Sequence, residues 1–441
     1  AIALIAAKVS VLSPATQVEV YGSALLLIVL AVPSAAVYVL AVVVPVSQTV
    51  LGAKFVTEKA FMVLVAVSVI GAACGGRIFR PKAKPTALAV ALVCYLLLSA
   101  LFVSGTQENA QSWRYALMST APLLCLPLIA GADVHTRRAV VLFSFTTACL
   151  SLIEAFTSHA SLHAASDLSA ADSAAVAAGQ TGAVNHNAEG ALFVLALSVL
   201  LAHSSHTRNG IAKLAHVSAI AAVAIGVAYS FSRASYFGAI AVMAVFALRR
   251  SVRGLLGATL GIGCLVPFLP SAVLARFGTV WSSTGLDASS AVRFDLWASA
   301  LRMFSSHPFF GVGYLDFAQQ LPAFYADTGN YEQSLVQFSS LDFAHSTYLT
   351  VLAETGLVGA VLVTALIVGG WRRARLCARA GEWVGEAAML AVVGVGVCSA
   401  FGEVLLLPAV LAGFLLVVLA GGRPTEAHSH ERSGPEAVAH A

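Results

Sequence analysis

Three side chains could perform chemistry in places where the chain otherwise carries little positive charge. Arg233 lies between two apolar runs, Arg293 lies in a long polar segment, and His345 lies where that segment meets the next apolar run. Arginine can grip phosphate oxygens in pairs through its planar fork. A histidine, with an ordinary pKa of about 6.5, can remove a proton from a hydroxyl near neutral pH. These residue types suit phosphate binding and general-base catalysis.

Each of the three also has a structural interpretation. Arg233 could anchor a helix end by reaching from the membrane interface to water. Arg293 could be a solvated residue paired with Asp295, and His345 could cap a helix. The residue types alone leave these alternatives open.

The composition excludes an ordinary soluble enzyme. Of the 441 residues, 59% are hydrophobic and 10% are charged, whereas soluble domains carry about 25% charged residues. The net charge of +4 is too small to indicate a nucleic-acid partner. The chain lacks a phosphate-binding loop, a dinucleotide-binding glycine motif and a zinc-binding H-E-x-x-H motif. We therefore expect no nucleotide, no metal and no other cofactor.

Apolar runs of the length needed to cross a bilayer recur along the chain. They predict an all-α, polytopic integral membrane protein with about twelve transmembrane helices. The expected spans cover residues 23–45, 60–76, 86–103, 114–131, 138–156, 188–203, 211–230, 234–248, 254–270, 346–370, 385–402 and 404–420.

The basic residues indicate the orientation. Of the 25 lysines and arginines, 18 lie at the termini or in one set of alternate loops. The positive-inside rule places those loops and both termini in the cytoplasm. We expect four parts: nine spans within 1–270, a large extracytoplasmic loop at 271–345, three spans within 346–420 and a disordered cytoplasmic tail at 421–441.

The large loop is too long for a bare connection and should contain helices. Between residues 290 and 304, Phe294, Trp297, Leu301 and Phe304 recur at helical spacing, with Asp295, Ser299 and Arg302 on the opposite face. His307-Pro308 and Gly311-Val-Gly313 are expected to end this helix.

Five motifs resemble those of the bacterial O-antigen ligase and polymerase superfamily. His345-Ser346, nine residues and then Gly356-Leu-Val-Gly359 fit the ligase signature His-[Asn/Ser/Gln]-x9-Gly-x-x-[Gly/Thr/Tyr]. The segments Arg293-Phe-Asp-Leu-Trp297 and His307-Pro-Phe-Phe-Gly-Val-Gly313 resemble the superfamily's arginine helix and the turn after it. Ser232-Arg233 resembles its Ser-Arg motif, and Asn185-His-Asn187 resembles an Asn-Pro-Asn motif, with His186 in place of proline.

The resemblance implies a GT-C-like membrane glycosyltransferase of the bacterial inner membrane with its active site facing the periplasm. An O-antigen ligase moves a polysaccharide from undecaprenyl diphosphate to a sugar hydroxyl of lipid A-core. The resemblance assigns Arg233 and Arg293 to the diphosphate and His345 to deprotonation of the acceptor. His307, Asp316, Asn185 and Asn187 are candidates for lining the substrate site. The reaction would be metal-independent and would invert the anomeric centre.

Other functions remain open. A polymerase or a protein O-oligosaccharyltransferase of the same superfamily would use similar motifs. A flippase for lipid-linked oligosaccharides would also bind a diphosphate, but the cytoplasmic halves of the expected spans lack matching cations. A channel or small-solute carrier should show two repeated halves, and we find no internal repeat.

Overall fold

The computed structural model describes residues 35–48, 86–103, 110–164, 185–250, 288–325 and 343–422. Every regular element in these ranges is a helix, as the composition predicts. The helices are α3 (Ala35–Val46), α5 (Ala87–Phe102), α6 (Ala110–Ile129), α7 (Val134–Ala164), α9 (His186–His206), α10 (Gly210–Tyr229), α11 (Arg233–Arg250), α14 (Ala288–Ser306), α15 (Phe317–Phe324), α17 (Thr347–Arg379), α18 (Trp383–Phe401), the 3-10 turn η3 (Val404–Leu406) and α19 (Pro408–Ala420).

Five described helices are long and apolar enough to cross a membrane. They are Val134–Phe156 within α7, and the helices α9, α10, α17 and α18. Shorter apolar helices cover Ala35–Val46, Ala87–Phe102, Ser119–Ile129 and Pro408–Ala420. These helices support a multi-pass membrane protein. The expected spans 60–76 and 254–270 and the tail from 423 onward lie outside the described residues, so the count of twelve stays a prediction.

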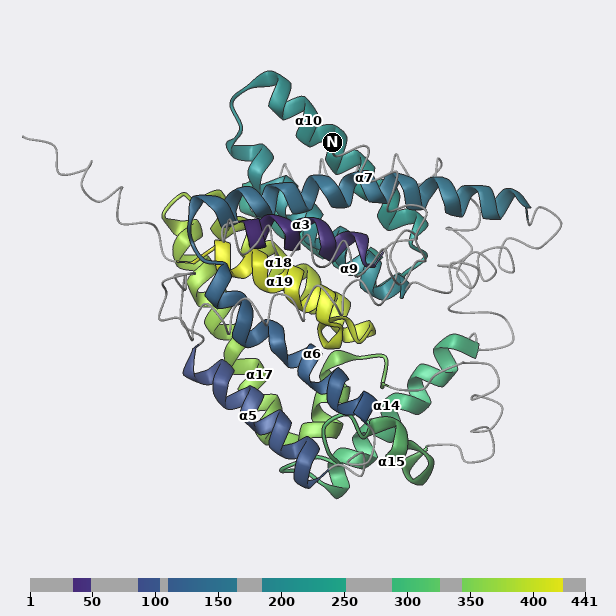
Figure 1. Ribbon diagram of the computed structural model, residues 1–441. Coiled ribbons are helices and arrows are strands. Elements are labelled where there is room, and N and C mark those ends of the chain that lie inside the picture. Colours follow the sequence, from purple (N-terminus) through teal and green to yellow (C-terminus); the bar gives the residue numbers. More distant parts are fainter. Residues whose placement is uncertain are drawn as a thin grey trace, which may run out of the picture.

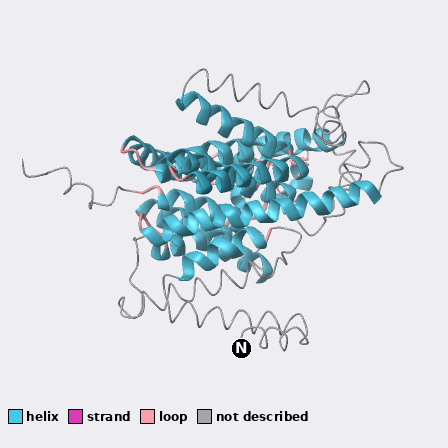
Figure 2. Cartoon of the chain, turned by 90° about the horizontal axis from the view of Figure 1, so that it is seen from above, coloured by secondary structure: helices cyan, strands magenta, loops and turns pink. Residues whose placement is uncertain are grey.

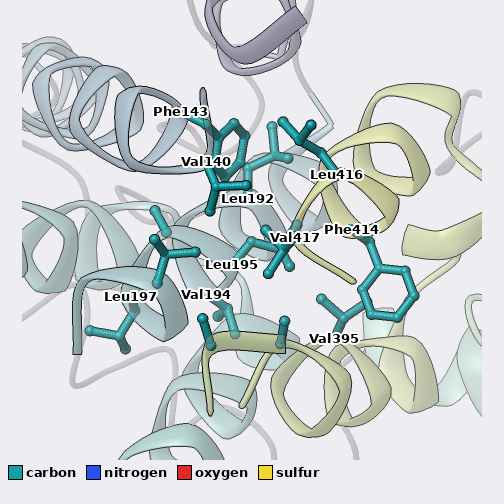
Figure 3. Packing of buried hydrophobic residues seen from close by; sticks show 14 of the residues in the cluster. Val140, Phe143, Leu192, Val194, Leu195, Leu197, Val395, Phe414, Leu416 and Val417 are labelled. Atoms are coloured by element: carbon teal, nitrogen blue, oxygen red, sulfur yellow. The ribbon is translucent and has the colours of Figure 1, made fainter. Parts of the chain in front are cut away.

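Helix α9 forms the centre of the larger helix group. It is buried on nearly all sides, from Ala188 to Leu200, and packs against α7, α10, α11, α18 and α19. A helix that is apolar all round belongs in the interior of a bundle or in a membrane. Figure 3 shows side chains from α7, α9, α18 and α19 meeting here, including Phe143, Leu192, Val395 and Val417.

Two glycines allow α11 and α18 to approach closely. A Cβ atom on Gly394 would lie 2.5 Å from methyl groups of Val194 and Val242, and one on Gly238 would lie 2.5 Å from the Cys398 sulfur. Small residues allow such close packing where apolar lipid cannot drive helices together.

Figure 2 shows the described part of the chain as helices joined by loops. The starts of α9 and α11 are joined by the hydrogen bond between Ser232 and Asn187, and Asn187 also lies against Gly402 at the end of α18.

A second helix group contains the helices of the expected loop. Helices α14 and α15 pack on α17, and α17 packs on α5, which contacts α6 (Figure 1). The helix expected at 290–304 is confirmed as α14, but the apolar stripe picked out by its spacing is not the buried one. Phe294 and Leu301 are about half exposed. The buried stripe is Val292, Leu296, Ala300 and Met303, which pack with residues of α15 and α17.

Candidate active site

His345 lies directly before α17 in a left-handed backbone conformation, with φ of 50°. Ser346 caps the helix by accepting a hydrogen bond from the Leu349 amide. A non-glycine residue in this region of backbone space is strained, and such strain concentrates at functional sites. The capping role that the sequence left open for His345 belongs to Ser346, so His345 is available for another role.

The ring of His345 is oriented by Glu403. Nδ1 of His345 lies 3.1 Å from Oε2 of Glu403, which lies in the link between α18 and η3. The Glu403 side chain is only 6% exposed, whereas that of His345 is 28% exposed. The carboxylate fixes Nδ1 as the donor. Among the described residues, Nε2 forms no hydrogen bond and is the nitrogen left to receive a proton.

Glu403 is held as an anion. Burial alone would raise the pKa of its carboxyl, but the hydrogen bond with His345, the electrostatic interaction with that residue and a hydrogen bond from Asn185 lower it from 4.5 to about 2. Nδ2 of Asn185 donates to Oε1 of Glu403 at 2.9 Å. The carboxylate therefore remains ionised at neutral pH and can orient the imidazole and stabilise its protonated form.

Asn185 and Asn187 connect this pair to the start of α9. Asn185 is the N-cap, and its Oδ1 accepts hydrogen bonds from the amides of Asn187 and Ala188 at 3.0 and 3.2 Å. Oδ1 of Asn187 accepts a hydrogen bond from the Ser232 hydroxyl at 2.8 Å. His186, which stands where the related motif has proline, is the first residue of α9. Proline is well tolerated at this position of a helix, so the two motifs serve the same helix start.

Ser232 brings Arg233 to the same place. Arg233 is the half-buried first residue of α11, and the preceding Phe231 has a left-handed backbone with φ of 50°. The α17 start is tied to the α18 end as well, because the Thr347 amide and hydroxyl both donate to the Gly402 carbonyl at 3.0 Å. The starts of α9, α11 and α17 and the end of α18 thus lie together. The motifs that contain Asn185, Asn187, Arg233 and His345 lie at these helix ends.

Arg293 belongs to the other helix group. It is half-buried on α14, which packs against α17. Its neighbour Val292 belongs to the same buried cluster as Ala344, the residue directly before His345. The arginine helix and the histidine therefore belong to one packed unit.

The first glycine of the histidine signature breaks α17. Gly356 has φ of 58° and ψ of −160°, which interrupts the helix. The turn after α14 inserts at this break. Two hydrogen bonds within α17 are absent there, and four hydrogen bonds between α17 and the turn take their place. Val312 and Gly313 donate to the carbonyls of Ala353 and Glu354 at 2.9 and 3.0 Å, and Leu357 and Val358 donate to the carbonyls of Pro308 and Phe309 at 2.8 and 3.2 Å.

His307 and Asp316 belong to this inserted turn rather than to the convergence of helix ends. His307 is exposed at the end of α14, and its Nδ1 lies 3.0 Å from the Ser306 hydroxyl. Asp316 is fully buried and accepts a hydrogen bond from Gln320 at 2.9 Å. Nearby, burial raises the pKa of the Tyr314 phenol well above its usual value. These contacts do not test the expected role of His307 and Asp316 in lining the substrate site, which stays a prediction.

Glu403 was not identified as a site residue from the sequence. This residue stands alone between two apolar runs, and no motif around it points to a partner. Its partners are a histidine and an asparagine that lie far away in the chain.

The comparison with protein families bears on this arrangement. Residues 216–364 match the family model described as O-antigen ligase. This match supports membership of the O-antigen ligase superfamily. The matched region covers about a third of the chain and contains Arg233, Arg293, the inserted turn, His345 and the break in α17. A search of curated proteins finds no match.

Members of the O-antigen ligase superfamily are glycosyltransferase-like enzymes acting on polysaccharide and lipid-linked substrates. Asn185 and Glu403 lie outside the matched region, on either side of it. Glu403 is joined to the matched region by its hydrogen bond with His345, and Asn185 is joined to it through its own hydrogen bond to Glu403.

Proposed function

We propose that this protein is an O-antigen ligase of the bacterial inner membrane. It transfers O-antigen polysaccharide from undecaprenyl diphosphate to a sugar hydroxyl of lipid A-core, at the periplasmic face. The observation that carries the proposal is the pairing of His345 with the buried, ionised Glu403. This pairing provides an oriented base at the point where four helix ends meet.

The proposed reaction needs no nucleotide because the lipid diphosphate is already an activated leaving group. Nε2 of His345 takes the proton of the acceptor hydroxyl while the hydroxyl oxygen forms a bond to the anomeric carbon. The bond from that carbon to the diphosphate oxygen breaks, and undecaprenyl diphosphate leaves with the bonding electrons. Release of the proton from His345 to water restores the base. In-line attack of this kind inverts the anomeric centre.

Two arginines are assigned to the diphosphate. Negative charge grows on the leaving group as the bond breaks, and fixed cations stabilise that charge best in a site that excludes water. Arg233 lies at the start of α11 next to Ser232, and Arg293 lies on α14. Their guanidinium groups can each bind two phosphate oxygens. Asn185 and Asn187 then act by holding Glu403 and Ser232.

A transfer assay tests this function. Purified protein is incubated with undecaprenyl-diphosphate-linked glycan and lipid A-core, with a chelator and without nucleotide, and lipopolysaccharide is detected on a gel. We expect a shifted band with the wild type and none with His345→Ala. His206→Ala is the matched control, because His206 is an exposed histidine at the opposite end of α9.

The same assay separates the alternatives. Longer lipid-linked chains formed without acceptor would identify a polymerase. The absence of any product from a folded wild-type protein would contradict transfer and favour a flippase. A fully active His345→Ala variant would remove the histidine from the mechanism.

A further inference from the structure

Tyr95 contributes a third element to the break in α17. Its hydroxyl donates to the Thr355 carbonyl at 2.6 Å and lies 3.3 Å from the Phe310 carbonyl in the inserted turn. In an unbroken helix the Thr355 carbonyl would accept a hydrogen bond from the Gly359 amide. The Tyr95 hydroxyl therefore bonds the carbonyl that follows, in sequence, the two carbonyls bonded by the turn. It links α5, the turn and α17.

The second glycine of the signature makes room for this tyrosine. A Cβ atom on Gly359 would lie 3.1 Å from Cε1 of the Tyr95 ring, and it would also collide with the Thr355 side chain. Gly356 and Gly359 thus accommodate two different partners. The first allows the turn to approach and the second allows the Tyr95 ring to approach.

We infer that Tyr95 is a positioning residue for the transfer reaction: its hydroxyl locks the inserted turn into α17 and so holds Arg293 in place relative to His345. This inference rests on the proposed function. The lock is defined as the four backbone hydrogen bonds between the turn and α17 together with the two contacts of the Tyr95 hydroxyl.

The chain connects the lock directly to both site residues. Helix α14, which carries Arg293, ends at Ser306, immediately before the turn. The first half of α17 runs from the residues after His345 to Thr355, a length of about 14 Å. Helix α14 and the first half of α17 both end at the lock. A shift of the turn along α17 therefore moves α14 relative to the start of α17.

The position of the lock inside a candidate membrane span makes its hydrogen bonds necessary. The break lies inside a candidate membrane span, and helix carbonyls opened there must find partners within the protein. Other groups on α5 and α6 also hold the segment after the turn. The Tyr314 amide donates to the Ser99 hydroxyl at 3.1 Å, and the Tyr314 hydroxyl lies 2.6 Å from that of Ser119. Removal of the Tyr95 hydroxyl therefore loosens the turn without freeing the whole segment.

The test uses Tyr95→Phe, which removes one oxygen and keeps the ring. Tyr38→Phe is the matched control, because the Tyr38 hydroxyl also has a cross-helix partner, His135 at 3.2 Å, on helices α3 and α7. Hydrogen–deuterium exchange of the full-length protein in detergent reports on the lock. We expect exchange at Val312 and Gly313 to become about tenfold faster in Tyr95→Phe and to stay unchanged in Tyr38→Phe.

Transfer kinetics separate positioning from general destabilisation. We expect Tyr95→Phe to lower kcat about tenfold per folded molecule, because small misplacements of a binding group are costly. In an Arg293→Lys background the same change should lower kcat less than about twofold, because residues that act through one another are not additive. General destabilisation would lower activity by the same factor in both backgrounds.

The outcomes are distinct. Unchanged exchange at Val312 and Gly313, unchanged activity, or equal losses in the two backgrounds would each overturn the positioning role of Tyr95. A folded wild type that forms no transfer product would instead contradict the proposed function itself.

Discussion

The backbones of Gly311 and Gly356 lie against each other, and neither position has room for a Cβ atom. A Cβ on Gly356 would lie 2.7 Å from the Gly311 nitrogen, and a Cβ on Gly311 would overlap the Glu354 carbonyl. Both residues have positive φ, 73° and 58° respectively. The contact joins the turn after the arginine helix to the helix that follows the histidine.

Gly356→Ala should therefore destabilise the protein strongly. Alanine is strained at positive φ, and its methyl group would force the turn out of the break in α17. We expect a large loss of folded protein, measured as monodisperse yield and as melting temperature in detergent. Gly369→Ala is the control in the same helix, because within the described part of the chain a Cβ there would meet only Arg373, at 4.0 Å. Alanine should be neutral or slightly stabilising at that position, and equal effects of the two variants would contradict the steric argument.

Glu403→Gln should lower the transfer rate while leaving the protein folded. The amide has nearly the size of the carboxylate, but it cannot accept hydrogen bonds at both ends from His345 and Asn185. We expect kcat to fall roughly tenfold to a hundredfold, because the imidazole loses both its orientation and the nearby negative charge. Glu382→Gln is the control, since Glu382 pairs with Arg137 at the opposite end of the bundle. A fully active Glu403→Gln variant would show that the pairing is only structural.

The sequence was informative wherever a residue type and its neighbours along the chain defined the feature. Apolar runs predicted helices α7, α9, α10, α17 and α18. The motifs around Asn185, Arg233 and His345 predicted that these residues share a site, and the structure brings the corresponding helix ends together. Each such motif lies at a helix start, where short sequence patterns determine local geometry.

The sequence was uninformative where partners lie far apart in the chain. Tyr95 stands in an apolar run like many others, and its role depends on Thr355 and Phe310, to which nothing in its own neighbourhood points. The buried face of α14 also depended on its partners. Phe294 and Leu301 are about half exposed, whereas Leu296 and Ala300 are buried and pack with residues of α15 and α17. Periodicity predicts that a helix has an apolar stripe, whereas the shape of the neighbouring helices selects which stripe is buried.

The contribution of Glu403 to stability should depend on pH in a defined direction. Its pKa in the folded protein, about 2, lies below the ordinary value of 4.5. The carboxylate therefore stabilises the fold above about pH 4.5, and this contribution is lost as the pH falls from 4.5 toward 2. We expect Glu403→Gln to have a lower melting temperature than the wild type at pH 6, with a smaller difference at pH 3. A difference that grows toward pH 3 would contradict the ionised state of Glu403.

Arg293→Lys should lose most of its transfer activity even though the positive charge is kept. A lysine presents one compact ammonium group and cannot bind two phosphate oxygens through a planar fork. We expect kcat/KM for the lipid-linked donor to fall about a hundredfold, on the order of 3 kcal/mol of lost transition-state stabilisation. Arg302→Lys on the same helix is the control. Among the described residues, Arg302 donates one hydrogen bond, to the Tyr325 carbonyl at 3.2 Å, which a lysine can replace. If Arg293→Lys kept full activity while Arg302→Lys lost it, the diphosphate would have to bind farther along α14, and the assignment of Arg293 would be wrong.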